Sequence, residues 1–278
     1  MRTDDIEDIV ERSLKEDLPD ITSEAIFGEH ERSQAWFMVK QDGIIAGLPA
    51  ARAVFAYLDE KSRFDLLKRD GDRVSRGDAI AVVNATVRAL LAGERTALNL
   101  LQRASGIATR TRSFVDAVEG TGARIYDTRK TAPGLRALDK YSVRTGGGHN
   151  HRFGLHDMVL IKNNHIDRAG SVQEAIKRVR GHGVKAPMMV EVRNMRELQQ
   201  ALAFSPDYIL LDNMGPEMLS QSVTFTAGRV PLEASGGVTL ENVRAIAETG
   251  VERISVGELT HSVRALDISV KIQAREGG

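Results

Sequence analysis

The segment from residue 145 to residue 165, TGGGHNHRFGLHDMVLIKNNH, gathers side chains that are able to do chemistry. It contains four of the seven histidines of the chain, together with one arginine, one lysine and three consecutive glycines. Such a set fits three kinds of site: a metal centre, a phosphate-binding loop or a pocket for a strongly anionic ligand. The residue types in and around the segment favour one of these alternatives.

A transition-metal site is the weakest of the three interpretations. His149 and His151 form an H-x-H pair, which is a candidate zinc element. The chain has no cysteine, however, and the flanking Arg152 and Lys162 would repel a cation. Further ligands at the usual spacing are missing. The glycines at 146–148 either end a helix as a loop or let the backbone approach a ligand closely, and the sequence favours neither. An anion pocket explains the segment best.

The charge distribution supports a small anionic ligand. The chain carries 38 basic and 38 acidic residues, so its formal net charge is zero and general binding to polyanions is not expected. Residues 95–165 nevertheless carry twelve basic residues against five acidic ones. A concentrated positive field in a cleft attracts a small anion. Aromatic residues make up only 5% of the whole chain, so the basic middle lacks the interleaved stacking side chains of a nucleic-acid binder.

The sequence also indicates a cytoplasmic protein. Its first residues, MRTDDIEDIVERSL, are acidic and lack the apolar core of a signal peptide. Its apolar runs all fall short of the roughly 18 residues that a membrane helix needs. The absence of cysteine excludes a disulfide framework and fits a reducing compartment. We therefore expect neither a membrane nor a nucleic acid as a partner.

The first part of the chain predicts a helix, then short strands, then a long helix. Apolar residues recur at helical spacing within residues 6–18. The run AWFMVKQDGIIAG predicts a hairpin around Asp42-Gly43, and two Gly-Asp turns further on indicate more β structure. Residues 94–120 form a predicted long helix with an apolar face and a glycine at its end.

From residue 123 onward, short β-rich runs alternate with helix-patterned segments. The strand-like runs are ARIYDTRK, DMVLIKNNH, PMMVEVR, DYILLDN, VPLEASGG and ERISVGELT. This alternation predicts an α/β fold with a parallel sheet. Six units suggest an α/β barrel that falls short of the usual eight, and a doubly wound open sheet is the main alternative.

Polar residues close each of these predicted strands. The six strand ends carry Asp127, Arg129 and Lys130; Lys162, Asn163, Asn164 and His165; Glu191 and Arg193; Asp212 and Asn213; Ser235, Gly236 and Gly237; and Gly257 and Glu258. In a barrel, the C-terminal strand ends form the active-site face. Six polar strand ends in succession therefore predict one shared site.

The predicted site has a basic part and an acidic part. Its bases come from the early strands and loops, and the planar arginine fork suits a carboxylate or a phosphate. Glu191 and Asp212 either hold magnesium or hydrogen-bond sugar hydroxyls, and the sequence does not separate these roles. The Ser-Gly-Gly turn at 235–237 and Gly257 offer backbone N–H groups to a phosphate. Such a site is typical of a ligand that carries more than one negative charge.

Longer motifs in the same region resemble the quinolinate phosphoribosyltransferase family, which is also called nicotinate-nucleotide pyrophosphorylase (carboxylating). They are ERTALNLLQRASGIAT, DTRKTAPGLRALDKYSVRTGGGHNHRFGLHDMVLIKNNH, ILLDN, LEASGG and SVGELTHS. The likeness runs through most of the chain and is strongest in residues 94–267. The long central block is highly specific, whereas the short pieces would be weak alone.

The resemblance implies a magnesium-dependent pentosyltransferase, which is a kind of glycosyltransferase. Its reaction would convert quinolinate and phosphoribosyl pyrophosphate to nicotinate mononucleotide, pyrophosphate and carbon dioxide, on the de novo route to NAD. It also implies an N-terminal α/β sandwich domain, expected at residues 1–104, and an incomplete, TIM-like α/β barrel, expected at residues 105–261. Residues 262–278 are expected to pack back on the first domain.

The resemblance further implies roles for individual residues. Lys130, Glu191 and Asp212 would be catalytic, and the two carboxylates would serve the metal and the ribose. In the family two subunits share each site, which makes Arg95 a candidate donor from the neighbouring chain and implies a homodimer or a higher homo-oligomer. The expected substrate-binding residues are Arg95, Arg129, Lys130, Thr131, His151, Arg152, Lys162, Glu191, Asp212, Ser235, Gly236, Gly237, Gly257 and Glu258.

Two positions depart from the family pattern. The lysine run reads KNNH, with Asn163 where an aspartate is more usual, and the run EVR carries Arg193 where another acid often follows. Both changes remove a negative charge near the predicted site. A related group associated with molybdenum transport diverges around the histidine-arginine and lysine positions. This sequence keeps those positions, which favours the quinolinate enzyme.

Overall fold

The computed structural model describes residues 1–274, which fold into two units. The first unit comprises residues 1–112, 131–147 and 262–274, and the second comprises residues 113–130 and 148–261. The predicted domain boundary between residues 104 and 105 falls inside one long helix, α4 (Val87–Ala117), and stays a prediction. None of the helices in the described part of the chain is long and apolar enough to span a membrane.

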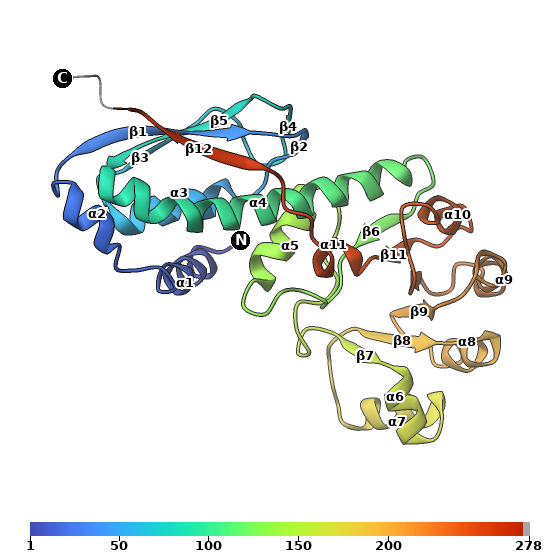
Figure 1. The fold of residues 1–278 in the computed structure, drawn as a ribbon. Helices are drawn as coiled ribbons and strands as arrows, with labels where there is room; N and C mark the ends of the chain where they lie inside the picture. The colour runs from blue at the N-terminus through green and yellow to red at the C-terminus, as the bar shows by residue number, and fades with distance from the viewer. Residues whose placement is uncertain (275–278) are drawn as a thin grey trace. The chain divides into compact units, whose positions relative to one another are not determined.

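The first unit is built on a four-stranded antiparallel sheet (Figure 1). In spatial order its strands are β12 (Ile268–Ile272), β1 (Arg32–Val39), β5 (Ala79–Thr86) and β3 (Arg63–Leu66). Buried and partly exposed side chains alternate along β1 and β5, as the two-residue repeat of a strand requires when one face is covered. A separate two-stranded sheet pairs β2 (Gly43–Ile44) with β4 (Arg73–Val74).

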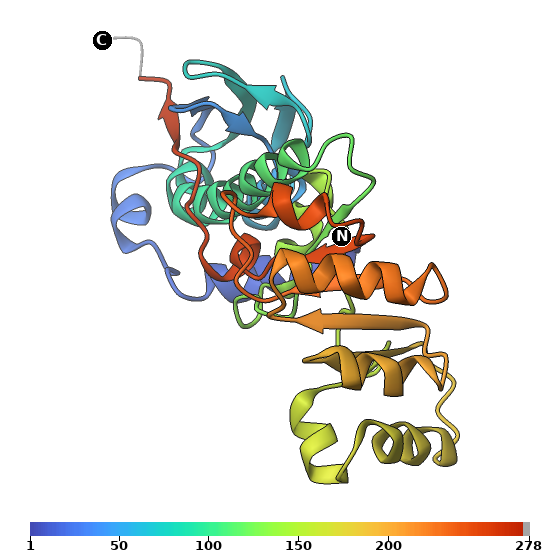
Figure 2. The same ribbon diagram turned by 90° about the vertical axis from the view of Figure 1, so that its right-hand side faces the viewer.

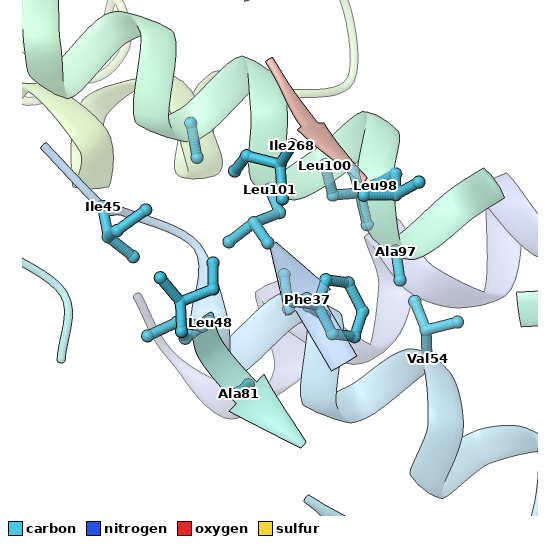
Figure 3. Packing of buried hydrophobic residues seen from close by; sticks show 14 of the residues in the cluster. Phe37, Ile45, Leu48, Val54, Ala81, Ala97, Leu98, Leu100, Leu101 and Ile268 are labelled. Atoms are coloured by element: carbon cyan, nitrogen blue, oxygen red, sulfur yellow. The ribbon is translucent and has the colours of Figure 1, made fainter. Parts of the chain in front are cut away.

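Helices and the four-stranded sheet enclose the core of the first unit. These helices are α1 (Thr3–Leu14), α2 (Ile21–Ile26), α3 (Leu48–Leu58), α5 (Arg136–Thr145) and the first part of α4. Phe37 of β1, Val54 of α3 and Leu101 of α4 gather in this core and are fully buried (Figure 3). Phe37 also meets Phe55 edge-on, with ring centroids 6.1 Å apart. Burial of each such side chain stabilises the fold by about 1.5–3 kcal/mol.

A buried ion pair joins α4 to α5 within the first unit. Asp139 is fully buried and accepts two hydrogen bonds from Arg103, through Nε and Nη2, each 2.8 Å long. The backbone N–H of Ala132 also donates to Asp139 Oδ2 over 3.1 Å. A buried carboxylate that is paired and fully hydrogen-bonded is tolerated, but the loss of its charge leaves the partner arginine uncompensated.

Replacement of Asp139 by asparagine is expected to lower the free energy of unfolding by about 2 kcal/mol. The value lies below that of a fully buried pair because the Arg103 side chain keeps 24% of its exposure. Urea denaturation would measure the change. The control is Asp8→Asn, whose ion pair with Arg12 is solvent-exposed and is expected to contribute about 0–0.5 kcal/mol. Equal effects of the two substitutions would contradict a stabilising role for the buried pair.

The second unit is built on six parallel strands (Figures 1 and 2). In spatial order they are β6 (Arg124–Tyr126), β11 (Arg253–Ser255), β10 (Leu232–Ser235), β9 (Tyr208–Asp212), β8 (Met188–Val192) and β7 (Val159–Ile161). The hydrogen-bonded ladder of the described residues runs from β6 to β7 without joining these two strands. The sheet is therefore a barrel that does not close, which confirms the predicted incomplete barrel.

Helices follow the strands of the second unit as the sequence predicts. They are α6 (Asn163–Ala169), α7 (Val172–Gly181), α8 (Met195–Leu202), α9 (Pro216–Thr226), α10 (Val243–Ala247) and the short α11 (Glu258–His261). Each helix from α7 to α10 packs against the next one. Five residues of β8 in succession are buried, as expected for a strand covered on both faces.

Two predictions about the first unit are wrong. The expected hairpin around Asp42-Gly43 does not form, because β1 pairs with β5 and β12, whereas β2 pairs with β4. The long helix begins at Val87, seven residues before the predicted start, because β5 runs directly into it. Gly93 weakened the helical signal there. A Cβ atom at this position would lie 2.9 Å from Leu58 Cδ1, so the glycine allows α3 to pack closely.

Candidate active site

The parallel strands of the second unit end together at one edge of the sheet. Asp212 of β9 is level with Ser235 of β10, and Ser235 is level with Ser255 of β11. Ser255 is in turn level with Tyr126, the last residue of β6. The polar strand ends that the sequence singled out therefore share the C-terminal edge of the sheet, where barrel enzymes place their active sites.

The two predicted carboxylates are linked by the residues that follow β7. Lys162 Nζ lies 3.0 Å from Glu191 Oε2, and the backbone N–H of Asn163 donates to Glu191 Oε1 over 3.2 Å. The side-chain amide of Asn163 donates to Asp212 Oδ2, also over 3.2 Å. Asn163 thus bridges the two carboxylates with neutral donors. An aspartate at this position would have no side-chain N–H for that contact and would add a third negative charge.

Arg129 lies close enough to Arg152 for its charge to affect the pKa of Arg152. Burial lowers the pKa of the Arg152 guanidinium, and the nearby charge of Arg129 lowers the pKa further. Arg152 Nη1 donates to the carbonyl oxygen of Met158 over 3.1 Å, which holds one side of the guanidinium. Two like charges that are held together in a partly buried place favour an anion between or beside them. This arrangement suits a ligand with two negative charges.

Two glycines leave room that any other residue would fill. A Cβ atom at Gly257 would lie 2.9 Å from Lys130 Cδ, so the glycine lets the Lys130 side chain lie across the end of β11. Thr260 Oγ1 donates to the carbonyl oxygen of Lys130 over 2.8 Å and holds its backbone. Gly236, after β10, has a φ of 94°, and a Cβ atom there would collide with the side chain of Asn213.

The two histidines of the H-x-H pair face different partners. His149 stacks on Tyr126 with ring centroids 5.2 Å apart, and burial, followed by the charges of Arg124 and Arg253, lowers its pKa. His151 is 9% exposed and directs its Nε2 at a carboxylate inside the barrel. The pair is therefore divided between an aromatic stack and a buried polar contact.

Glu191 and Asp212, together with Asn163 between them, form the acidic edge of the site. The acidic edge fits magnesium that is bound together with a phosphorylated substrate. Within residues 1–274, no group of three or more His, Asp or Glu side chains is placed to hold a metal ion. Magnesium, however, is commonly held by one or two carboxylates plus substrate phosphates. Asn163 Oδ1 is buried without a hydrogen-bond partner, and the same amide contacts Asp212. The oxygens of Glu191, Asp212 and Asn163 are the ligand type that magnesium prefers.

Two predicted site residues belong to the first unit. Arg95 is exposed on α4. Thr131 Oγ1 accepts a hydrogen bond from Arg136 Nε over 3.0 Å. The other predicted residues lie in the second unit, which by itself brings together most of the basic and acidic parts of the expected site.

Arg193, the other departure from the family pattern, is engaged by two neighbouring helices. Its guanidinium lies 3.0 Å from Asp167 of α6 and 2.6 Å from Glu197 of α8. These contacts raise the pKa of Arg193, first through Glu197 and then through Asp167. Among the described residues, the guanidinium is therefore tied to the two helices and not to Glu191 or Asp212.

Comparison with known proteins shows the family of the chain. The family described as quinolinate phosphoribosyl transferase, N-terminal domain, matches residues 20–105, and the corresponding C-terminal domain family matches residues 107–271. The chain belongs to the quinolinate phosphoribosyltransferase family. The family predicted from the sequence motifs is thereby confirmed.

Individual members of the quinolinate phosphoribosyltransferase family match most of the chain. The probable nicotinate-nucleotide pyrophosphorylase (carboxylating) of Bacillus subtilis is 46% identical over 256 residues, which are 91% of this chain and 88% of the relative. The nicotinate-nucleotide pyrophosphorylase (carboxylating) of Mycobacterium leprae is 44% identical over 273 residues, 95% and 96% of the two chains. The crystal structure of nicotinate-nucleotide pyrophosphorylase from Ehrlichia chaffeensis superposes with a TM-score of 0.92 at 39% identity, covering 98% and 99%.

Glu233 is a polar residue of this quinolinate phosphoribosyltransferase fold that the sequence analysis missed. It is the second residue of β10, is fully buried, and lies with Oε1 3.4 Å from His151 Nε2. The signal was present in the motif LEASGG, because a lone acid in a buried strand needs a partner. The prediction from that motif rested on its Ser-Gly-Gly turn alone.

Proposed function

We infer that this chain transfers the phosphoribosyl group of phosphoribosyl pyrophosphate to quinolinate, with loss of carbon dioxide. The products are nicotinate mononucleotide, pyrophosphate and carbon dioxide, so the reaction serves NAD biosynthesis. Membership of the quinolinate phosphoribosyltransferase family carries this conclusion. The chemistry of the strand ends is consistent with it, because quinolinate has two carboxylates and the sugar donor has a monophosphate and a pyrophosphate.

The basic residues receive the acceptor in this proposal. Arg129 and Arg152 neutralise the carboxylates of quinolinate, and the closeness of the Arg129 charge to the partly buried Arg152 supports a dianion at this place. Lys162 adds a third positive charge near the acidic edge. Lys130 lies across the end of β11 and serves the phosphates together with the backbone N–H groups of Gly257 and Glu258.

The acidic residues act on the ribose. As pyrophosphate departs, C1 of the ribose gains positive charge, and Glu191 and Asp212 stabilise it. The pyridine nitrogen of quinolinate then bonds to C1. The resulting pyridinium accepts the electron pair released when the 2-carboxylate leaves as carbon dioxide, and that ring carbon is protonated. Positioning of the two substrates supplies much of the rate, and no covalent enzyme intermediate is needed.

Magnesium is the proposed metal at the acidic edge. Glu191, Asp212 and the unpartnered Oδ1 of Asn163 would hold it. When bound, the ion supplies positive charge that neutralises the pyrophosphate group. The three side chains have a second role without the ion, because Asn163 keeps the two carboxylates in fixed positions.

We further propose a homodimer, or a higher homo-oligomer, in the cytoplasm. Arg95, exposed on α4, would complete the site of the neighbouring subunit. The cysteine-free sequence supports the reducing compartment. Thr131 is proposed to join the phosphate-binding residues.

Calorimetric measurement of phosphoribosyl pyrophosphate binding, with and without magnesium, tests whether the acidic edge holds the metal. Magnesium is expected to tighten binding to the wild type by about tenfold or more, and this gain should vanish in Asp212→Asn, which loses one charged ligand. The matched control is Asp207→Asn. Asp207 lies at the opposite end of β9 and accepts from Met188 N over 2.7 Å. A full magnesium effect in Asp212→Asn would remove this carboxylate from the metal site.

A further inference from the structure

Glu233 places a negative charge inside the barrel, where an isolated charge is costly. Its Oε2 accepts a hydrogen bond from Arg253 Nε over 2.7 Å, and its Oε1 accepts one from Ser255 Oγ. Burial raises the pKa of Glu233, but its hydrogen bond with His151, the charge of Arg253 and the hydrogen bond from Ser255 outweigh burial and leave the pKa below its usual value. Glu233 is therefore a carboxylate that the structure keeps charged.

Arg253 compensates this charge from a fixed position. It stands directly across from Glu233 in the parallel ladder of β10 and β11. Its guanidinium lies 3.9 Å from the ring centroid of Tyr126 and 4.5 Å from that of Tyr208, within reach of cation–π attraction to both. The Arg253 side chain is 12% exposed. Arg253 is thus the buried counter-ion of Glu233 Oε2, and Glu233 Oε1 faces His151.

His151 is held at three of its atoms. Its backbone N–H donates to Asp127 Oδ1 over 2.8 Å, and its Nε2 faces Glu233 Oε1 at 3.4 Å. Its Nδ1 accepts a hydrogen bond from the backbone N–H of Arg152 over 2.7 Å. An Nδ1 that accepts carries no proton, so the proton of the imidazole is on Nε2, where it points at the carboxylate. This pattern is that of a neutral imidazole.

We propose that Glu233 is a positioning residue that acts through the neutral Nε2–H form of His151 to hold Arg152 against a carboxylate of the acceptor substrate. The inference rests on the proposed function, in which Arg152 binds quinolinate. His151 then contributes no positive charge of its own. Because His151 is fixed by Glu233 of β10, its Nδ1 fixes the backbone N–H of Arg152. The Arg152 guanidinium is also held by the carbonyl oxygen of Met158. The charged residues in contact with His151 or with its partner Glu233 are the acids Glu233 and Asp127 and the bases Arg152 and Arg253.

The first test determines the form of the imidazole in the wild-type enzyme. Nitrogen-15 NMR on protein labelled at histidine would be assigned by the signals that disappear in His151→Gln. The proposal predicts a pyrrole-type Nε2 and a pyridine-type Nδ1 at pH 7. An imidazolium, with both ring nitrogens protonated, would overturn it. This measurement does not depend on the stability of any Glu233 variant.

The second test is a double-mutant cycle on quinolinate binding, measured by calorimetry. Glu233→Gln keeps the size of the side chain and removes its charge. It is expected to weaken quinolinate binding about tenfold, with binding of phosphoribosyl pyrophosphate changed by less than about twofold. In an Arg152→Ala background the same substitution should cause no further loss. An additive loss in the double variant would show that Glu233 acts through general stability and would overturn the proposal.

Two further variants sharpen the result. Ser255→Ala removes one hydrogen bond to Glu233 and keeps the charge of Glu233. Quinolinate binding is therefore expected to weaken less, by about twofold. Ser255→Ala replaces Glu233→Gln in the cycle if that variant fails to fold. Glu252→Gln is the control, because Glu252 accepts from Leu232 N at the opposite end of the sheet and should leave quinolinate binding unchanged. If Arg152→Ala alone leaves quinolinate affinity unchanged, the proposed contact between Arg152 and quinolinate is wrong. That outcome is distinct from one in which Arg152→Ala weakens binding but Glu233→Gln adds a further, independent loss.

Discussion

Arg152→Ala is expected to raise the dissociation constant of quinolinate about a hundredfold. A charge-assisted, two-pronged contact between a guanidinium and a carboxylate contributes about 2–3 kcal/mol, and each 1.4 kcal/mol is a factor of ten in affinity. The guanidinium is partly buried beside Arg129, so water replaces the lost contact poorly. Binding of phosphoribosyl pyrophosphate should change much less, because the substitution removes the acceptor contact alone.

The comparison for this prediction is a surface arginine of the same unit. Arg196 is exposed on α8, and Arg196→Ala should leave both dissociation constants within about twofold, as surface substitutions usually do. Thermal unfolding of both variants would show whether the fold is retained. Unchanged quinolinate affinity in folded Arg152→Ala would exclude Arg152 from the acceptor site.

Mixing two inactive variants is expected to restore activity if each site is shared by two subunits. Arg95→Ala alone and Arg152→Ala alone should each lose most of the turnover. In a randomly mixed homodimer population about half of the molecules carry one subunit of each kind, and each of these has one intact site. The mixture should therefore recover about a quarter of the wild-type activity.

The mixing experiment requires proof that subunits exchange. Mixed dimers would be isolated with two different affinity tags and assayed after purification. Arg110→Ala paired with Arg152→Ala is a suitable comparison, since Arg110 lies on the same helix as Arg95 but is not assigned to the site. Purified mixed dimers of Arg95→Ala and Arg152→Ala that remain inactive would contradict a site shared in this way.

The strand ends were predictable from the sequence because their signal is local. An apolar run that stops at a charged or small residue marks a strand end, and parallel strands bring such ends to one edge. Lys162, Glu191 and Asp212 were placed in this way, and the structure brings them to one edge through Asn163. Motif likeness, and not periodicity, supplied the family and the identities of the substrates.

The parts that could not be predicted depend on partners far apart in the sequence. The run after β1 looked like a hairpin because its turn residues are local, whereas the true partners of β1 lie more than forty and more than two hundred residues away. Glu233 was overlooked for the same reason. The role of its carboxylate depends on His151, Arg253 and Ser255, which only the folded barrel brings next to it.

The most direct test of the central claim is product formation by the purified protein. The protein would be incubated with magnesium and phosphoribosyl pyrophosphate, with quinolinate in one reaction and nicotinate in another, while nicotinate mononucleotide and carbon dioxide are followed. Turnover with quinolinate and equal release of carbon dioxide, with little turnover of nicotinate, is the expected result. Folded protein that binds phosphoribosyl pyrophosphate but leaves quinolinate unchanged would contradict the assigned acceptor.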